Sequence, residues 1–226
     1  RLWGVNLDFS ALPQSREAID QLADQLAALG FNAARVHSLD RARPAAPGAL
    51  ARAAGASGAA AAGGLEAQAL DRLDFLVAAL KKRGVYTWIT LQSERMFGPA
   101  DRIPGAEDGA VAARELIFFD PRAQWILGEF ATALLDRRNP HTGLRYAREP
   151  ALAAVEISAG ASLLSAWLDG ALEDWPEAQR ALLERGFLLF LREKYGTTEA
   201  LRAAWAAGER REGKNLLLDG EFRQWG

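Results

Sequence analysis

The chain has 226 residues with a nearly balanced charge, since 27 lysine and arginine residues oppose 29 aspartate and glutamate residues. Half of the residues are hydrophobic and a quarter are charged, which is typical of a folded protein with a core rather than of a disordered chain. The balanced charge predicts no broad attraction to nucleic acid, and no apolar run reaches the roughly 18–20 residues that a membrane helix needs. The chain contains no cysteine, which excludes disulfides, thiolate catalysis and cysteine-ligated metal centres.

The sequence contains no motif for a metal or a cofactor. His37 and His141 are the two histidines, and they lie too far apart along the chain to form a metal-binding motif. No glycine-rich nucleotide-binding motif follows any of the predicted strands. We therefore expect neither a cofactor nor a metal site.

Strands and amphipathic helices are predicted to alternate along the chain. The predicted strands cover about residues 2–7, 31–37, 85–91 and 152–158, where apolar and β-branched residues gather. The predicted helices cover about residues 15–29, 66–83, 120–138, 177–195 and 198–206, where apolar residues recur at spacings of three and four. Residues 41–64, rich in alanine and glycine, and residues 92–119 are predicted to be long loops.

Repeated strand–helix units predict an α/β fold with a parallel sheet and right-handed crossovers. About four such units fit into the chain, so the sheet is either a doubly wound open sheet or an incomplete (β/α)8 barrel of the TIM-barrel type. The absence of a nucleotide-binding motif weakens the first alternative.

The candidate functional residues lie toward the carboxyl ends of the predicted strands, where parallel sheets and barrels place their sites. Asp8 follows the first strand, Arg35 and His37 end the second, Trp88 lies on the third and Glu156 on the fourth. A tryptophan in a cleft suits stacking against a sugar, although most of the seven tryptophans are expected to pack in the core or on helices. His37 is interpreted either as a hydrogen-bonded core residue or as a functional one.

Glu156 is predicted to point into the interior of the sheet. Strand alternation places it opposite Val155 and Ile157, which are expected to face the helices. A buried carboxylate needs a cation, and Arg35 is the clearest candidate. The pair is interpreted either as a structural ion pair or as part of a binding site.

Several stretches carry a combination of motifs that is more specific than any one of them. They are residues 4–8 (GVNLD), 29–40 (LGFNAARVHSLD), 73–86 (LDFLVAALKKRGVY), 119–121 (FDP), 139–146 (NPHTGLRY), 150–157 (PALAAVEI) and 193–202 (EKYGTTEALR). Together they resemble the N-terminal half of a clan A glycoside hydrolase, a cellulase- or β-galactosidase-like (β/α)8 barrel. The resemblance implies that the ligand is a carbohydrate and that Arg35 and His37 line the sugar site nearest the scissile bond. It also favours an extracytoplasmic location.

The sequence departs from this family where the chemistry is expected. Such enzymes end strand four in Asn-Glu, the Glu being the general acid/base, but these positions correspond to Ala159 and Gly160. The family nucleophile is a Glu on strand seven, whereas this chain is expected to stop before strand five. Retaining hydrolysis needs two carboxyl groups about 5–5.5 Å apart, and Glu156 lies roughly 13 Å upstream of Gly160 along a strand. We therefore expect no catalytic residue in this chain.

Residues 1–206 are expected to form the N-terminal (β/α)4 portion of the barrel, and residues 207–226 a tail that begins a further strand or module. The chain starts at Arg1 without an initiator methionine, so we expect part of a longer protein. A half-barrel exposes unpaired strand edges, which either a homodimer or the missing C-terminal half would cover. The sequence thus favours a glycoside-hydrolase-like barrel portion acting on, or descended from an enzyme acting on, β-linked glycans. The alternatives are a non-catalytic glycan-binding protein and an engineered half-barrel that assembles with a second copy or a partner.

Overall fold

The computed structural model describes residues 1–40, 67–106 and 114–208. The chain divides into two compact units, residues 1–182 and 183–226. The loop expected at residues 41–64 and the strand expected in the tail after residue 208 lie outside the described residues.

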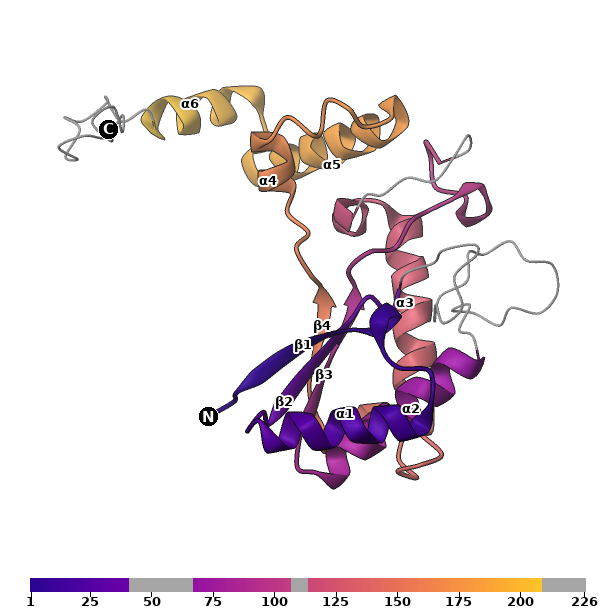
Figure 1. The fold of residues 1–226 in the computed structure, drawn as a ribbon. Coiled ribbons are helices and arrows are strands. Elements are labelled where there is room, and N and C mark those ends of the chain that lie inside the picture. The colour runs from indigo at the N-terminus through magenta and orange to yellow at the C-terminus, as the bar shows by residue number, and fades with distance from the viewer. Residues whose placement is uncertain (41–66, 107–113, 209–226) are drawn as a thin grey trace, which may run out of the picture. The chain divides into compact units, whose positions relative to one another are not determined.

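Unit 1 contains a parallel sheet of four strands in the order β1-β2-β3-β4 (Figure 1). The strands are β1 (Gly4–Asp8), β2 (Ala33–His37), β3 (Tyr86–Gln92) and β4 (Leu152–Ser158). The helices that connect them are α1 (Arg16–Ala28), α2 (Ala67–Lys82) and α3 (Pro121–Leu135). Spatial order therefore follows chain order, and the sheet of the described residues does not close.

Local signals in the sequence set the helix ends. The Ser15 hydroxyl accepts a hydrogen bond from the amide of Ala18 and so caps α1. Gly30, with a φ of 84°, adopts the left-handed conformation that follows this helix. The Asp120 carboxylate accepts hydrogen bonds from the amides of Arg122 and Ala123, so Asp120 caps α3.

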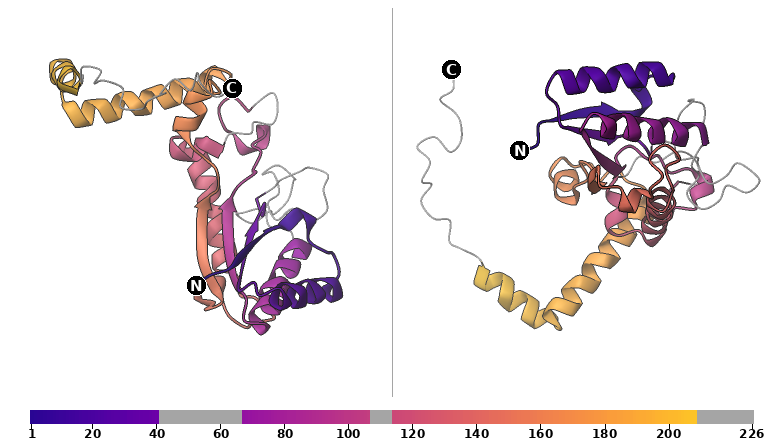
Figure 2. Two further views of the ribbon diagram at one scale, coloured as in Figure 1. Left: turned by 60° about the vertical axis from the view of Figure 1, so that its left-hand side comes forward. Right: turned by 90° about the horizontal axis from the view of Figure 1, so that it is seen from below.

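The main core lies between one face of the sheet and the helices. Helices α1 and α2 lie side by side on this face, as two further views show (Figure 2). Ile19 of α1, Leu73 of α2, Val36 of β2 and Ile89 of β3 are fully buried there. Because strand residues alternate between faces, burying these side chains leaves the polar residues of β2 on the opposite face of the sheet.

The described part of the segment after β3 contains more regular structure than the long loop expected at residues 92–119. Two short 3₁₀ helices, Pro99–Asp101 and Arg114–Phe118, lie in it. Its apolar residues form a second buried cluster with α3, consisting of Phe97, Ile103, Ala106, Leu116, Ala123 and Ile126. The spacing of these residues in the sequence matches neither a helix nor a strand, so periodicity did not predict this core.

The outer face of β4 differs from the expectation that Val155 and Ile157 pack against helices. The predicted alternation of side chains along β4 is confirmed, because Val155 and Ile157 lie on the face opposite Glu156. They do not pack against helices, however, since Val155 is 39% and Ile157 66% exposed. The short helix α4 (Leu163–Leu168), which follows β4 and was not expected, buries none of its residues. The helices α5 (Glu177–Tyr195) and α6 (Thr198–Gly208) occur where the sequence predicts them. Among the described residues, no helix is long and apolar enough to cross a membrane.

A buried ion pair joins the end of α2 to the start of β4. The Lys81 ammonium lies 2.8 Å from the Glu149 carboxylate, whose side chain is 2% exposed against 35% for Lys81. Burial raises the pKa of Glu149, but hydrogen bonds from Lys81 and from the amide of Ala151 outweigh it, so the pKa lies below its ordinary value of 4.5. A lowered folded-state pKa means that the pair stabilises the fold above about pH 4.5 and that this stabilisation is lost as the pH falls through the folded-state pKa.

We expect Lys81→Met to lower the free energy of unfolding at neutral pH by about 1–3 kcal/mol, less than for a fully buried pair because Lys81 is partly exposed. The same substitution removes the cation that lowers the pKa of Glu149, so the variant is expected to lose less stability than the wild type as the pH falls below about 4.5, and the difference in stability between the two to shrink there. Urea denaturation at a series of pH values measures both effects. The neighbouring exposed Lys82→Met is the control, and equal effects of the two substitutions would contradict the role of the pair.

Candidate functional site

The face of the sheet opposite the core carries a row of polar and aromatic side chains. The strand register aligns Asn6 of β1 with Arg35 of β2 and Trp88 of β3. Nearer the carboxyl ends, Asp8 aligns with His37, and Thr90 with Glu156. The four strand ends therefore contribute to one surface, which would face the interior of a closed barrel.

Arg35 and Glu156 form the ion pair that the sequence suggested. Arg35 donates from Nε and Nη2 to Glu156 Oε2, at 2.8 and 2.7 Å. Thr90 donates its hydroxyl to the same oxygen at 2.6 Å, a contact that sequence reasoning missed although Thr90 shares the parity of Trp88. The side chains of Arg35 and Glu156 remain 23% and 26% exposed. The pair is thus held rigidly and still reaches solvent.

Trp88 lies directly beside this ion pair. It is the register neighbour of Arg35 and is 37% exposed, on the face opposite the core. Tyr86, two residues earlier on the same face, is 45% exposed. An exposed aromatic ring next to fixed charged groups provides both an apolar surface and hydrogen-bonding groups.

His37 is held by a chain of polar contacts at the end of β2. Its Nδ1 lies 2.9 Å from the Ser38 hydroxyl, and that hydroxyl donates to Glu94 Oε1 at 3.2 Å. Because the Ser38 proton is directed to Glu94, the imidazole donates from Nδ1 and presents Nε2 as an acceptor.

Ser38 is itself in an unusual conformation, with a φ of 61° that non-glycine residues rarely adopt. Its buried amide donates to Ser93 Oγ, and the Ser93 hydroxyl donates to Asp40. The Asp40 carboxylate also accepts from the amides of Ser93, Glu94 and Arg95. These bonds tie the ends of β2 and β3 together.

Asp8 takes part in a local turn after β1. Its Oδ1 accepts from the amide of Ser10 at 2.9 Å and from the Ser10 hydroxyl at 2.7 Å, which caps the 3₁₀ helix Phe9–Ala11. The structure places Asp8 beside His37 in the strand register.

Gly160, the position expected for a general acid/base, differs from a glutamate site in its backbone as well as its side chain. Its φ is 69°, in the left-handed region that favours glycine. A Cβ atom at this position would lie 3.0 Å from Nη1 of Arg114, and that guanidinium donates to the carbonyl of Ala159 at 3.4 Å. A glutamate at residue 160 would therefore be strained and would displace Arg114.

Within the described ranges, no group of three acidic or histidine side chains is arranged to hold a metal ion. The described residues of this surface offer hydrogen-bonding groups, charges and an aromatic face.

No protein-family model matches the sequence, and no curated protein matches it. Solved structures do match. An endo-1,4-β-D-mannanase from Thermotoga petrophila superposes with a TM-score of 0.56 at 17% identity, over 76% of this chain and 49% of that chain. An endo-1,4-β-mannanase from Rhizomucor miehei gives a TM-score of 0.51 at 15% identity, over 76% of this chain and 52% of that chain. The fold is that of half a (β/α)8 barrel.

The half-barrel spans about half the length of the solved mannanase structures that it matches. The expected resemblance to clan A glycoside hydrolases is thereby confirmed as a likeness of fold. In the half-barrel, Arg35, Trp88 and Glu156 lie together, and His37 lies beside them at the end of β2.

Proposed function

We propose that this half-barrel is a portion of a glycoside-hydrolase-like protein that binds a β-linked glycan at the carboxyl end of its sheet and does not itself perform hydrolysis. The observation that carries the proposal is the fixed Arg35–Glu156 ion pair beside the exposed ring of Trp88. The likeness of fold to mannanases makes β-1,4-linked mannan the glycan to test first.

The groups on this surface suit a pyranose ring. Trp88 offers an aromatic face that stacks on the apolar side of a sugar. The guanidinium of Arg35 donates hydrogen bonds, and the Glu156 carboxylate accepts them. His37, with Nε2 as the acceptor, adds a further contact for a hydroxyl group at the end of β2. Because both charged partners are already held in place, a ligand orders few additional side chains when it binds.

Hydrolysis by a retaining mechanism requires a carboxylic acid and a carboxylate about 5–5.5 Å apart. At the expected acid/base position the half-barrel has Gly160, which has no group to transfer a proton. Glu156 accepts three hydrogen bonds at Oε2 from Arg35 and Thr90, which fits a binding group rather than a proton donor. We therefore assign binding, and not bond cleavage, to these residues.

A second reading is a non-catalytic scaffold that assembles with another half-barrel, either a second copy or a partner. The exposed outer side chains of Val155 and Ile157 on the edge strand β4 favour it. The molar mass in solution, measured over a range of concentrations, distinguishes the two readings, since a dimer at low concentration supports assembly with a second copy.

Trp88→Ala is the direct test of the glycan site. We expect it to weaken the binding of a manno-oligosaccharide by about tenfold, because the stacking surface is lost. Isothermal titration calorimetry measures the dissociation constant, and an assay for reducing ends checks that the wild type releases no product. The control is Trp205→Ala, since Trp205 of α6 is also exposed. Unchanged binding in Trp88→Ala, or turnover by the wild type, would contradict the proposal.

A further inference from the structure

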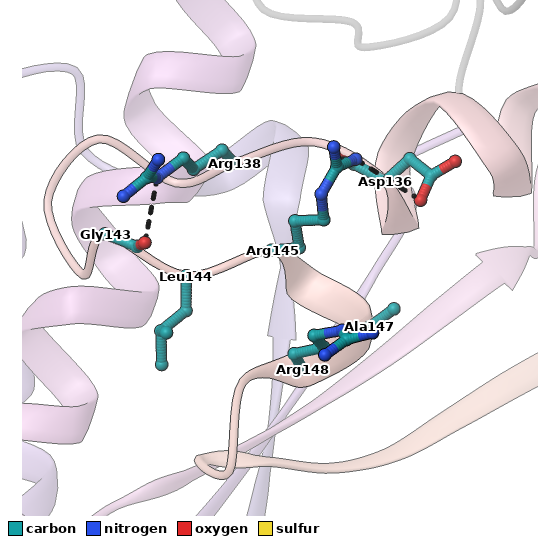
Figure 3. Close-up of a pocket in the computed structure, with 7 residues that line it drawn as sticks. All are labelled: Asp136, Arg138, Gly143, Leu144, Arg145, Ala147 and Arg148. Atoms are coloured by element: carbon teal, nitrogen blue, oxygen red, sulfur yellow. Dashed lines mark hydrogen bonds and ion pairs between the residues drawn. The ribbon is translucent and has the colours of Figure 1, made fainter.

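A pocket lies in the loop between α3 and β4, at the amino end of the sheet and away from the proposed glycan site (Figure 3). Its volume is about 460 Å³. Three arginines line it, Arg138, Arg145 and Arg148, together with Leu144 and a single carboxylate, Asp136. This volume is in the range of small-molecule sites, which are about 300–1,000 Å³.

Two of the three arginines are fixed by main-chain contacts. Arg138 donates from Nε to the carbonyl of Gly143 at 2.9 Å, as Figure 3 shows. Arg145 donates from Nη1 to the carbonyl of Asp136 at 2.7 Å. An antiparallel bridge pairs the backbones of Arg138 and Arg145, so the turn between them brings the two side chains to one pocket.

The loop that carries these arginines is anchored from inside the protein. Asn139 is buried and accepts hydrogen bonds from the amides of His141 and Thr142. Tyr146 is also buried, and its hydroxyl donates to Asp74 at 2.9 Å. The pocket is therefore built on a rigid turn, which reduces the entropy that a ligand has to overcome.

The charge of the pocket is strongly unbalanced. Three guanidinium groups and one carboxylate line the pocket, and Asp136 Oδ1 lies 3.5 Å from Nη1 of Arg145, a distance that gives only a weak ion pair. The amide of Arg148 donates to the carbonyl of Arg145 at 2.9 Å, whereas its guanidinium makes no hydrogen bond or ion pair with the part of the chain that the structure describes. Guanidinium groups bind phosphate oxygens with paired N–H donors, so an oxyanion is the ligand that this arrangement favours.

We propose that this pocket binds a phosphomonoester of a small molecule, with the phosphoryl group among Arg138, Arg145 and Arg148. The volume exceeds what a phosphate ion alone fills, and the exposed side chain of Leu144 offers a contact for the carbon skeleton of the ligand. The proposal is independent of the glycan site, because the two surfaces lie at opposite ends of the strands.

The test is a calorimetric titration of the full chain with a hexose phosphate, inorganic phosphate and the unphosphorylated hexose. We expect the hexose phosphate to bind more tightly than inorganic phosphate, and the unphosphorylated hexose to show no saturable binding. Arg148→Gln is expected to weaken hexose phosphate binding by at least about tenfold, since a charged hydrogen-bonding partner is lost. Added salt is expected to weaken binding further, because this pocket is open to solvent.

The matched control is Arg185→Gln, an exposed arginine of α5 far along the chain. Circular dichroism of both variants confirms that they fold, and Arg148 is suited to this comparison because its loss breaks no contact of the described structure. Equal binding by the two variants, equal affinity for hexose and hexose phosphate, or tighter binding of inorganic phosphate would each overturn the proposal.

Discussion

Asp74→Ala is expected to lower the free energy of unfolding by about 3–5 kcal/mol, because it leaves the partly buried Arg137 without its counter-charge and the buried hydroxyl of Tyr146 without its acceptor. Asp74 is fully buried in α2, and its Oδ2 accepts two hydrogen bonds from Arg137, at 2.9 and 2.6 Å. Its Oδ1 accepts from Tyr146, and its backbone carbonyl accepts from Asn139. The Asp74 side chain therefore ties two residues of the connection between α3 and β4, Arg137 and Tyr146, to helix α2.

The charges in this cluster also act on Tyr146. Burial raises the pKa of the Tyr146 hydroxyl well above its ordinary value, and the neighbouring Asp74 carboxylate raises it further. The hydroxyl therefore stays protonated and continues to donate to Asp74.

Urea denaturation of Asp74→Ala measures the effect, with the midpoint expected to fall and the slope to stay unchanged. The control is Asp71→Ala on the same helix, where the carboxylate pairs with Arg16 but both side chains are about half exposed. Exposed pairs contribute about 0–1 kcal/mol, so this substitution is expected to have little effect. Similar losses of stability in the two variants would show that the buried network does not secure the loop.

Arg35→Met is expected to reduce both stability and glycan binding. It leaves the half-buried Glu156 without its cation, at a cost of about 2 kcal/mol, below the value for a fully buried pair. Replacing both partners, in Arg35→Met with Glu156→Leu, is expected to restore most of the stability, since a hydrophobic pair can replace an ion pair at little net cost. Denaturation of the single and double variants gives the coupling energy.

The double variant also separates the structural reading of the ion pair from the functional one. If Arg35 and Glu156 bind glycan, the double variant binds a manno-oligosaccharide at least about tenfold more weakly even though it is stable. If the stable double variant binds as tightly as the wild type, the pair is structural only, and the proposed site is incorrect.

Alternation and helix spacing were sufficient to predict the four strands of unit 1 and the helices α1, α2 and α3 in their order, but not the short helix α4. The same alternation placed Glu156 on the face opposite Val155 and made Arg35 its partner, as the structure has it. The contact from Thr90 could not be predicted, because it depends on the β3–β4 register, which shifts between Thr87 and Trp88. Register is set by long-range packing, which the pattern of a single strand does not contain.

Other features depend on contacts between distant segments. The second core cluster gathers residues without periodic spacing onto the start of α3. The sequence showed that residue 160 has no side chain. Its left-handed backbone conformation and the approach of Arg114 could be known only from the structure. The sequence did not predict the pocket of three arginines either, because the pocket depends on a tight turn that brings Arg138 beside Arg145.

The most direct test of the account is to map where a manno-oligosaccharide binds, by titrating it into the nitrogen-15-labelled chain. We predict chemical-shift changes at the Trp88 indole and at amides near Arg35 and Glu156, with no shorter oligosaccharides formed during the titration. Changes confined to other surfaces, no changes at saturating sugar, or the appearance of cleavage products would contradict a glycan-binding half-barrel without hydrolytic activity.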